Sequence, residues 1–442
     1  MRAELQPGAS LKGGRYRIER KLNAAPAKDV YLARDEADFA VVLDVIPAEV
    51  VGAGGYAAAG EARLMRRLGG HRNIAQVLDS WEDDESSYMV TRYLPGGSLQ
   101  DVIDAAGREH EPLPPDRILA FALQLASALD YIHREGFVHR DLQPRNVLLD
   151  DWGTLRLVDF DTAISLDDPD APPILDGRSA AYMAPEVAVG ERADERADLY
   201  SLGTTIYALC EGCAVGEKEE IHRRVSMGVL DFERSDLPLG LRRLVSALLA
   251  ARREDRPASA AEVLRQLEQL ATKERELDAL VASDESATLE FKSSLRTPVA
   301  SVDLGETRTA DVGRALERKV VQTIAAFMNS TQGGTLVIGV GDDKAIVGIE
   351  VDYLLTKPQS RDGWRLAFDA LVSDSLGLDA LPSIGLQLHP YRGKTVAVIR
   401  CQSRDQPTWI AGEAFVRRTA STQRLTTQEA WAWFQDRWRS SR

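Results

Sequence analysis

The chain has very little cysteine and no long apolar run. Its 442 residues include only three Cys, which excludes a disulfide framework and fits a reducing compartment. It contains no stretch of about 18 apolar residues, the length that a membrane-spanning helix requires. Its N-terminus also lacks the apolar core of a signal peptide. We therefore expect a cytoplasmic protein that has no membrane partner.

The chain also lacks an excess of basic residues. It has 54 Lys and Arg against 68 Asp and Glu, a net charge of −14. Residues 284–442 hold 20 of the basic and 19 of the acidic residues, so 34 and 49 remain for residues 1–283. Because the N-terminal part is strongly acidic, it repels nucleic acid, and we expect any nucleic-acid contact in the C-terminal part.

A single C-x-x-C pair, Cys210 and Cys213, is present. Structural zinc sites usually take four ligands, and this pair supplies only two. Ordinary packing is therefore the stronger interpretation, and a metal site is the weaker one.

The length of the chain favours two or three domains, because single cores rarely exceed about 250–300 residues. We expect a flexible start over residues 1–14, a first domain over 15–270, a helical connector over 271–283 and a second domain over 284–442. The connector is charged and contains no Gly or Pro, which favours a helix.

Apolar spacing predicts the elements of the second domain. Strands are expected at 289–292, 335–340, 345–350, 384–390 and 394–401, and helices at 312–327 and 364–372. Thr426 and Glu429 form a capping-box pattern for a final helix. That helix carries the aromatic residues Trp431, Trp433, Phe434 and Trp438. Packing of the helix is the stronger interpretation of this cluster, and stacking on nucleic-acid bases is the weaker one.

Three motifs in the first domain stand in a fixed order. Residues 139–146 read His-Arg-Asp-Leu-Gln-Pro-Arg-Asn, residues 159–161 read Asp-Phe-Asp, and residues 184–186 read Ala-Pro-Glu. Together they resemble the catalytic loop, the D-F-G motif and the A-P-E motif of eukaryotic-type Ser/Thr protein kinases, which also occur in bacteria. The resemblance implies a two-lobed α+β kinase fold, followed by a smaller α+β domain in a multi-domain α/β chain.

The resemblance also implies roles for individual residues. Asp141 matches the residue that accepts the proton of the substrate hydroxyl, and Asn146 and Asp159 match the two Mg²⁺-binding positions. Glu61 stands where the family has the glutamate of its regulatory helix. ATP, Mg²⁺ and a protein substrate or regulator are therefore the expected cofactors and partners. Within the activation segment, Thr162 and Ser165 are candidate phosphate acceptors.

The nucleotide-binding half departs from the family pattern. The Gly-rich loop is replaced by residues 23–30, which contain no glycine but include Pro26. Asp44 occupies the position of the strand-3 lysine, and Gln143 that of a lysine in the catalytic loop. A carboxylate about 4 Å from a phosphate charge costs roughly 4 kcal/mol at an effective dielectric of about 20. These departures favour a pseudokinase.

Lys28 favours the opposite interpretation. It occupies the third glycine position of the loop, from which the with-no-lysine kinases supply the charge that their third strand lacks. On this interpretation Lys28 binds nucleotide and contacts Asp44 or Glu61. The alternative is that Lys28 is an ordinary solvated lysine, as most lysines are.

The second domain carries a different set of motifs. Residues 285–292 read Glu-Ser-Ala-Thr-Leu-Glu-Phe-Lys, residues 326–334 read Ala-Phe-Met-Asn-Ser-Thr-Gln-Gly-Gly, and residues 338–343 read Ile-Gly-Val-Gly-Asp-Asp. These segments resemble the Schlafen-type AlbA-like domain over roughly residues 284–425. The family is linked to nucleic acids, so RNA or DNA is an expected partner.

The resemblance to Schlafen RNases implies a three-carboxylate metal site formed by Glu285, Glu290 and Asp342, where Mg²⁺ or Mn²⁺ activates water. Three interpretations remain open, namely cleavage, binding without cleavage, and a role that only involves protein partners. In the last two, Glu290 pairs with Lys292 or an arginine. Candidate contacts to a nucleic-acid backbone are Arg314, Arg318, Lys319, Arg417 and Arg418.

Two hypotheses for the whole chain follow. The first is an atypical Ser/Thr kinase that uses Asp141 as the base, Asn146 and Asp159 for Mg²⁺, and Lys28 as the relocated lysine. The second is an inactive pseudokinase that gates a C-terminal nucleic-acid-binding or metal-dependent RNase domain. Fusions of this kind suggest roles in stress response or phage defence only by association.

Overall fold

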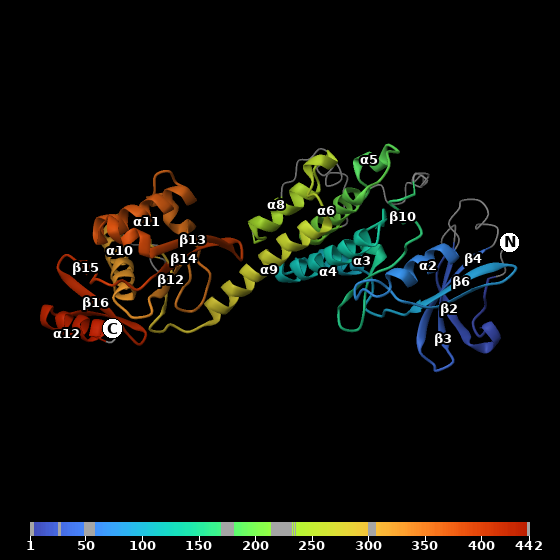
Figure 1. Ribbon diagram of the computed structural model, residues 1–442, viewed down its shortest axis with the longest axis horizontal. Helices are drawn as coiled ribbons and strands as arrows, with labels where there is room; N and C mark the ends of the chain where they lie inside the picture. Colours follow the sequence, from blue (N-terminus) through green and yellow to red (C-terminus); the bar gives the residue numbers. More distant parts are fainter. Residues whose placement is uncertain are drawn as a thin grey trace. The chain divides into compact units, whose positions relative to one another are not determined.

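The computed structural model describes residues 4–24, 28–47, 58–168, 181–213, 232, 234, 236–298 and 306–439. Chain contacts divide the protein into two compact units. The first contains Met1–Arg234 and Gly240–Ala271, and the second contains Ser235–Leu239 and Thr272–Arg442. Each unit is described by itself below, and Figure 1 labels many of the helices and strands.

The first unit begins with an antiparallel six-stranded sheet in the order β1-β2-β3-β4-β6-β5. The strands are β1 (Ser10–Leu11), β2 (Tyr16–Ala24), β3 (Asp29–Asp35), β4 (Ala40–Pro47), β5 (Val77–Glu82) and β6 (Ser86–Arg92). Alternating residues bury one face of this sheet in a core that includes Tyr31, Leu43 and Val90. Helix α2 (Ala58–Leu68) packs against β5 and β6.

The start of the chain differs from the sequence expectation. Residues 10–14 form β1 and the short 3-10 helix η1 (Lys12–Gly14), whereas the composition predicts a flexible segment. Asp79 on β5 holds this segment through ion pairs with Lys12 and Arg15 and a hydrogen bond from Tyr16. These tertiary contacts outweigh the local preference of the glycines in the segment for irregular structure.

The rest of the first unit is mainly helical. Its helices are α3 (Leu99–Glu109), α4 (Pro115–Arg134), α5 (Pro185–Ala188), α6 (Glu195–Glu211), α8 (Leu239–Leu248) and the first half of α9 (Ala260–Ala282), with 3-10 turns η2 (Pro144–Asn146) and η4 (Arg253–Asp255). Helices α4 and α6 pack together and bury most of their apolar residues. Two small antiparallel sheets support the motif-bearing loops: β7 (Phe137–Val138) with β10 (Ile164–Ser165), and the hairpin β8 (Val147–Leu149) with β9 (Leu155–Leu157). This arrangement confirms the expected two-lobed fold, with a sheet-rich and a helical part.

The second unit is built on a four-stranded sheet in the order β11-β12-β14-β13. The strands are β11 (Leu289–Lys292), β12 (Gly334–Ile338), β13 (Ile384–Tyr391) and β14 (Lys394–Cys401), and only β11 and β12 pair in parallel. One face packs against α10 (Glu306–Met328) and α11 (Arg361–Leu376), with η6 (Leu378–Ser383) beside them. Leu277 and Val281, in the second half of α9, cover the other face. The expected connector is therefore part of the core of this unit.

The expected strand at 345–350 is absent. Residues Ile349–Leu355 instead form the 3-10 helix η5, and only an isolated bridge joins Val340 to Ile346. The buried carboxylate of Asp352 stabilises this turn, because it accepts hydrogen bonds from the backbone N–H of Leu295 and the indole N–H of Trp364.

A smaller sheet completes the second unit. It contains β15 (Trp409–Ile410), β16 (Glu413–Arg418) and β17 (Ser421–Leu425), and α12 (Thr427–Arg439) packs on it. The capping box is present, since Glu429 accepts from Thr426 N–H and donates its own N–H to Thr426 Oγ1. Phe434 is fully buried and Trp431 is exposed. Within the described ranges, no helix is long and apolar enough to cross a membrane.

Candidate functional site

Lys28 lies at the centre of three carboxylates in the first unit. Its Nζ is 2.8 Å from Asp159 Oδ1, 3.5 Å from Asp44 Oδ2 and 4.0 Å from Glu61 Oε1. Lys28 directly precedes β3, and its three partners come from β4, from α2 and from the loop after β9. The lysine side chain is 14% exposed. The interpretation of Lys28 as a solvated lysine is therefore wrong.

This cluster has strong mutual electrostatic effects. Burial alone lowers the pKa of Lys28, but the charges of Asp44, Glu61 and Asp159 outweigh it and raise that pKa well above its ordinary value. Burial raises the pKa of Asp44, and Lys28 opposes this rise. Burial also raises the pKa of Glu61 to about 7, against the effect of Lys28 and with a further rise from Asp159 and Asp44. Lys28 therefore remains charged and carries the positive charge of the cluster.

Glu61 connects α2 to the Asp-Phe-Asp motif. Its Oε1 accepts a hydrogen bond from the backbone N–H of Phe160 at 3.0 Å. The Phe160 ring is fully buried and meets the His139 ring edge to face at 4.6 Å. The second carboxylate oxygen of Glu61 is buried and has no hydrogen-bond partner among the described residues. Glu61 therefore holds helix, motif and lysine together, but its own charge is only partly compensated.

Amide side chains surround the carboxylate of Asp141. Gln143 Nε2 donates to both carboxylate oxygens, each at 3.0 Å. Asn146 Nδ2 donates to Asp141 Oδ2 at 2.7 Å and to the Asp141 carbonyl oxygen at 3.0 Å. Because Asn146 directs its amide nitrogen at Asp141, its amide oxygen faces away and is the atom that could bind a metal ion.

A buried aspartate fixes the loop that carries Asp141. Asp198 on α6 is fully buried and accepts the backbone N–H of His139 at 2.8 Å and of Arg140 at 2.7 Å. Its other partner is the Nε2 of His133, at 2.8 Å. Arg140 and Asp159 both adopt left-handed backbone angles, with φ of 67° and 64°. Such strained residues persist where surrounding contacts hold them, often at functional sites.

The activation segment is described only in part. Thr162 Oγ1 donates to the His139 carbonyl oxygen at 2.9 Å, and Ser165 Oγ accepts the N–H of Asp167 at 3.3 Å. Both candidate phosphate acceptors therefore have hydrogen-bond partners here. In the segment 23–30 that replaces the Gly-rich loop, Pro26 lies outside the described residues.

In the second unit, Glu290 is part of a buried ion-pair network. Arg417 Nη1 donates to Glu290 Oε2 at 2.7 Å, and Lys292 Nζ contacts Glu290 Oε1. The Arg417 side chain is 1% exposed. It also donates to the Ser286 carbonyl oxygen at 2.6 Å and lies over the Phe327 ring. Arg417 is thus an internal counter-ion for Glu290, and the expectation that it contacts a nucleic-acid backbone is wrong for this arrangement because the side chain is buried.

The other two acids of the predicted metal site have separate environments. Glu285 Oε1 accepts the backbone N–H of Phe291 at 2.9 Å, and Asp342 is exposed. Across the described ranges, no three His, Cys, Asp or Glu side chains are grouped so that they could hold a metal ion. Glu290 pairs with Lys292 and with an arginine, as the two interpretations without cleavage predict. The metal site formed by Glu285, Glu290 and Asp342 stays a prediction.

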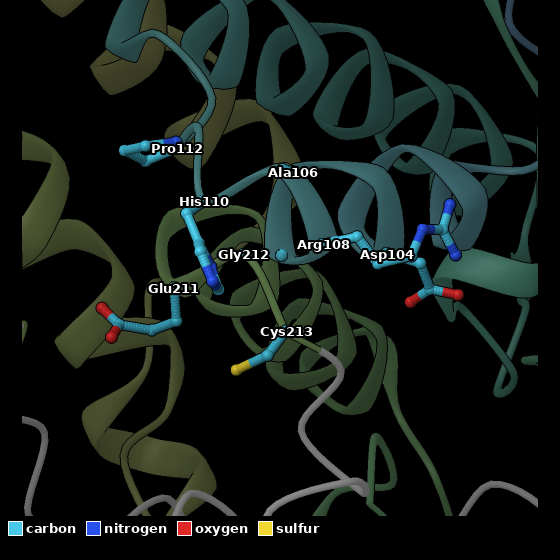
Figure 2. Close-up of a pocket in the computed structure, with 9 residues that line it drawn as sticks. Asp104, Ala106, Arg108, His110, Pro112, Glu211, Gly212 and Cys213 are labelled. Carbon is cyan, nitrogen blue, oxygen red and sulfur yellow. The ribbon is translucent and has the colours of Figure 1, made fainter.

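A separate cavity of about 610 Å³ lies where α3 and α6 end. Figure 2 shows its lining residues, which include Arg108, His110, Glu211 and Cys213. Cys213 lines this cavity, whereas Cys210 is buried within α6. The C-x-x-C pair therefore belongs to a helix end, and none of the residues predicted for the kinase site lines the cavity.

Two contacts at the candidate sites could not be predicted from the sequence. The motif comparison identifies Gln143 only as a missing lysine, but the structure makes it a donor to Asp141. Arg417 appears in the sequence as one of several basic residues of the C-terminal part, without a sign that it is buried. No local pattern could reveal the second contact, because Arg417 and Glu290 are 127 residues apart.

Comparisons with known proteins agree with this geometry. The family described as "Protein kinase domain" matches residues 29–267, and the family described as "Schlafen, AlbA_2" matches residues 285–426. The chain is 29% identical over 334 residues to the serine/threonine-protein kinase pkn2 of Myxococcus xanthus, covering 71% of this chain and 37% of the relative.

Other relatives match the kinase part. Serine/threonine-protein kinase PknK of Mycobacterium bovis is 34% identical over 46% of this chain and 19% of its own length. Serine/threonine-protein kinase PrkC of Bacillus subtilis is 32% identical over 45% of this chain and 31% of its own length. The chain thus spans well under half the length of these curated relatives.

The pKa of Glu61 leads to a pH-dependent prediction. Its value of about 7 in the folded protein exceeds its ordinary value of 4.5. The stability that Glu61 contributes is therefore present below its ordinary pKa and is lost as the pH rises through about 7. Because Glu61→Gln cannot ionise, its melting temperature should rise relative to wild type between about pH 4.5 and about pH 7 and then stay level. Each kcal/mol corresponds to about 2–4 °C.

Thermal unfolding of the full chain, followed by circular dichroism, measures this difference. Glu36→Gln is the matched control, since Glu36 is 71% exposed and belongs to no buried cluster. Its difference from wild type should not change over the same pH range. If the difference in melting temperature between Glu61→Gln and wild type decreases as the pH rises, the raised pKa of Glu61 is wrong.

Proposed function

We propose that this chain, which belongs to the protein kinase family, binds ATP with Mg²⁺ in its first unit and acts as an atypical Ser/Thr kinase-like regulator. The observation that carries the proposal is the 2.8 Å contact between Lys28 Nζ and Asp159 Oδ1. It supports a relocated lysine charge beside a residue of the Mg²⁺-binding motif, although Asp44 replaces the usual lysine.

The residues near Lys28 fit a nucleotide complexed with a metal ion. Asn146 and Asp159 would hold Mg²⁺, which neutralises phosphate charge when it is bound. Asp159 uses Oδ1 for Lys28, and Asn146 uses its amide nitrogen for Asp141. Each therefore keeps one oxygen for a metal ion, and oxygen is the ligand that Mg²⁺ prefers.

The position of Asp44 suggests that its carboxylate repels the phosphates of ATP. In this proposal the carboxylate pairs with Lys28 instead. Its carboxylate is only 13% exposed and lies 3.5 Å from Lys28 Nζ. A carboxylate paired with a lysine repels phosphate less than an isolated one, because the ammonium compensates its charge. Asp44 thus anchors Lys28, which would contact the phosphates of bound ATP.

The catalytic loop supports transfer to a protein hydroxyl. Asp141 would accept the hydroxyl proton, as the general base of this family does. Gln143 and Asn146 orient its carboxylate through three hydrogen bonds. Gln143 is neutral, however, so the site has one positive charge fewer to stabilise the transferred phosphoryl group than the family pattern provides.

A second candidate is an inactive kinase fold that binds nucleotide or a partner and gates the second unit. The neutral Gln143, and the anion Asp44 where the family has a cation, favour this candidate. The two candidates share nucleotide binding and differ in transfer. For either candidate, a role in stress response or phage defence is suggested only because domain fusions of this kind are associated with those roles.

We further propose that the second unit binds RNA or DNA without cutting it. The observation that supports this is the buried pairing of Glu290 with Arg417 and Lys292. A metal ion at Glu290 would have to displace two cations, one of them buried. Removing a partner from a buried ion pair costs roughly 3–5 kcal/mol. Exposed basic residues, such as Arg418 on β16 and Arg318 on α10, are the candidate backbone contacts.

The first prediction concerns nucleotide binding. Wild type should bind Mg-ATP in the micromolar-to-millimolar range, and Lys28→Ala should weaken binding by at least about tenfold, or 1.4 kcal/mol. Combining Lys28→Ala with Asp44→Lys should restore part of the affinity, because the charge returns from the β4 side. Isothermal titration calorimetry measures all three proteins.

Lys21→Ala provides the matched control for this experiment. Lys21 lies on β2 and pairs with Asp29 and Glu4, so its loss removes the same charge outside the cluster. This variant should retain wild-type affinity. Absence of heat with wild type at millimolar Mg-ATP would reject nucleotide binding, and equal losses in the Lys28 and Lys21 variants would reject the role of Lys28.

The second prediction concerns phosphoryl transfer. Asp141→Asn should abolish autophosphorylation and transfer to an added protein, while affinity for Mg-ATP stays within about twofold. The reason is that a general base acts in the transition state and contributes little to ground-state binding. Mass spectrometry detects the phosphate and calorimetry measures the affinity. Phosphate on the Asp141→Asn protein would exclude this role, and its absence from wild type would favour the inactive candidate.

The third prediction concerns nucleic acid. The full chain should bind a structured RNA or a DNA duplex and leave it intact with Mn²⁺ or Mg²⁺. Arg418→Ala should weaken binding and reduce the slope of log affinity against log salt by roughly 1, as expected when a phosphate contact is lost. Fluorescence anisotropy at several salt concentrations measures both quantities.

Arg392→Ala is the control for this prediction. It removes the same charge from the β13–β14 turn, where Arg392 pairs with Asp278, and should bind as wild type does. Cleavage that requires a divalent metal and stops in Asp342→Asn would instead establish the three-carboxylate site. Asp342 is the suitable test position because it is exposed, whereas Glu290→Ala would leave Arg417 buried without its partner.

A further inference from the structure

Strand β13 forms one edge of the four-stranded sheet in the second unit. It has eight residues, Ile384–Tyr391, and pairs along its length with β14 on one side. The opposite edge of the sheet is β11, which has only four residues and whose Leu289 carbonyl oxygen lies within reach of Arg417. The long edge of the sheet is therefore β13.

The turn before β14 determines which backbone groups of β13 face outward. Arg392 and Gly393 form a two-residue turn with φ of 46° and 76°, the signs of a type I′ hairpin. Tyr391 and Lys394 then form the hydrogen-bonded pair that closes it, so the odd-numbered residues of β13 bond to β14. The even-numbered residues Ile384, Leu386 and Leu388 direct their N–H and C=O groups away from the sheet.

Two observations agree with this assignment of outward-facing backbone groups. Arg361 Nη2 donates to the carbonyl oxygen of Leu388 at 2.5 Å, which requires that oxygen to point outward. Pro390, another even-numbered residue, has no N–H, and proline occurs in sheets where the missing donor would face away from the ladder. The N–H of Ile384 donates to the carbonyl oxygen of Leu381. Within the described ranges, the N–H and C=O groups of Leu386 and the N–H of Leu388 have no hydrogen-bond partner.

The strand carries little protection against pairing with another strand. Its sequence, Ile-Gly-Leu-Gln-Leu-His-Pro-Tyr, contains no lysine and no acidic residue. Proteins usually protect long edge strands with charged residues, bulges or covering elements. Here the side chains of Ile384, Leu386 and Leu388 pack against the core, and Gly385 and Gln387 are exposed.

Positive charges predominate near His389 of the strand, whereas Asp278 and Glu274 lie near Tyr391 at its end. Burial lowers the pKa of His389 on this strand, and Lys273, Arg400 and Arg361 lower it further, whereas Glu276 alone opposes them among the main contributors. Arg400 Nη1 also donates to Gln387 Oε1 at 3.1 Å. Three cations from α9, β14 and α11 thus lie near His389 of this strand, which itself carries no charged residue.

We propose that β13 binds an extended acidic segment of a partner protein as an additional strand, with carboxylates of that segment near Arg361, Arg400 and Lys273. The proposal goes beyond nucleotide and nucleic-acid binding and depends on neither. The outward N–H and C=O groups require a ligand with alternating backbone acceptors and donors, which a peptide has and a nucleic acid lacks. A second copy of β13 would bring its own three cations against those of the first copy, so charge disfavours it.

The first test is amide hydrogen exchange in the full chain. The probe is a peptide as long as β13 in which valine alternates with glutamate. The peptide should slow exchange at Leu386 and Leu388, whose N–H groups face outward. Gln387 and His389 already bond to β14 and should change little. Mass spectrometry with residue-level fragmentation resolves this alternation, which only strand addition produces.

The second test uses charge reversal. Arg361→Glu with Arg400→Glu should weaken binding of the same labelled peptide by at least about tenfold. The matched control combines Arg314→Glu with Arg318→Glu on α10, which makes the same change in net charge and should leave affinity within about twofold. A peptide in which lysine replaces glutamate should bind wild type more weakly than the acidic peptide by a similar factor.

Several results would overturn the proposal. Protection at odd and even positions alike would exclude strand addition, and equal losses in both charge-reversal proteins would reduce the effect to net charge. An oligonucleotide that protects Leu386 and Leu388 when the peptide does not would assign the edge to nucleic acid. A wild-type dimer in which these two amides are already protected would assign it to a second copy.

Discussion

The contact of one ammonium group with three carboxylates holds together two strands, helix α2 and the Asp-Phe-Asp loop of the first unit. Lys28 meets Asp44, Glu61 and Asp159 within 4.0 Å, and these residues join two strands, a helix and the Asp-Phe-Asp loop. Without the ammonium, three acids in a largely buried space would repel one another and could stay together only by binding protons or a metal ion. The lysine thus makes an acidic residue at position 44 compatible with this fold.

The same constraint explains the left-handed backbone at Asp159. A non-glycine residue with φ of 64° is strained, and the strain persists only where neighbouring contacts fix the residue. Lys28 binds the Asp159 side chain, and Glu61 binds the next backbone N–H, that of Phe160. On the other side of the site, Asp198 fixes Arg140, which has the same left-handed conformation. Buried carboxylates thus hold both halves of the site in their backbone conformations.

The second unit applies the same principle in its interior. Arg417 is a cation contributed by the chain itself, and it compensates Glu290 while bonding to the backbone of β11 and its preceding turn. It joins the smaller sheet to the larger one, and Asn329, directly after α10, joins the end of that helix to the smaller sheet through the carbonyl oxygens of Thr408 and Phe415. Replacing such an ion pair by apolar residues can be neutral, but removing one partner is costly. Glu290 therefore has a structural role in this arrangement.

Local sequence determined much of the fold. Strands β11 and β14 have the bounds that the apolar pattern predicts, and the capping box of α12 is formed by the two expected residues. The ordered kinase motifs predict roles for Asp141, Asn146 and Asp159, because each motif is a short segment whose residues are neighbours in the chain. The sequence also indicated Lys28 as a candidate and named Asp44 and Glu61 as its possible partners.

Tertiary structure decided the questions that depend on distant residues. Lys28 and Asp159 are 131 residues apart, so only the folded chain shows that the lysine is buried among carboxylates and not solvated. The burial of Arg417, the 3-10 turn that replaces a strand after residue 348, and the outward backbone groups of β13 likewise depend on packing and pairing between elements. Sequence patterns record the preferences of neighbouring residues, whereas burial and charge compensation arise only when distant segments meet.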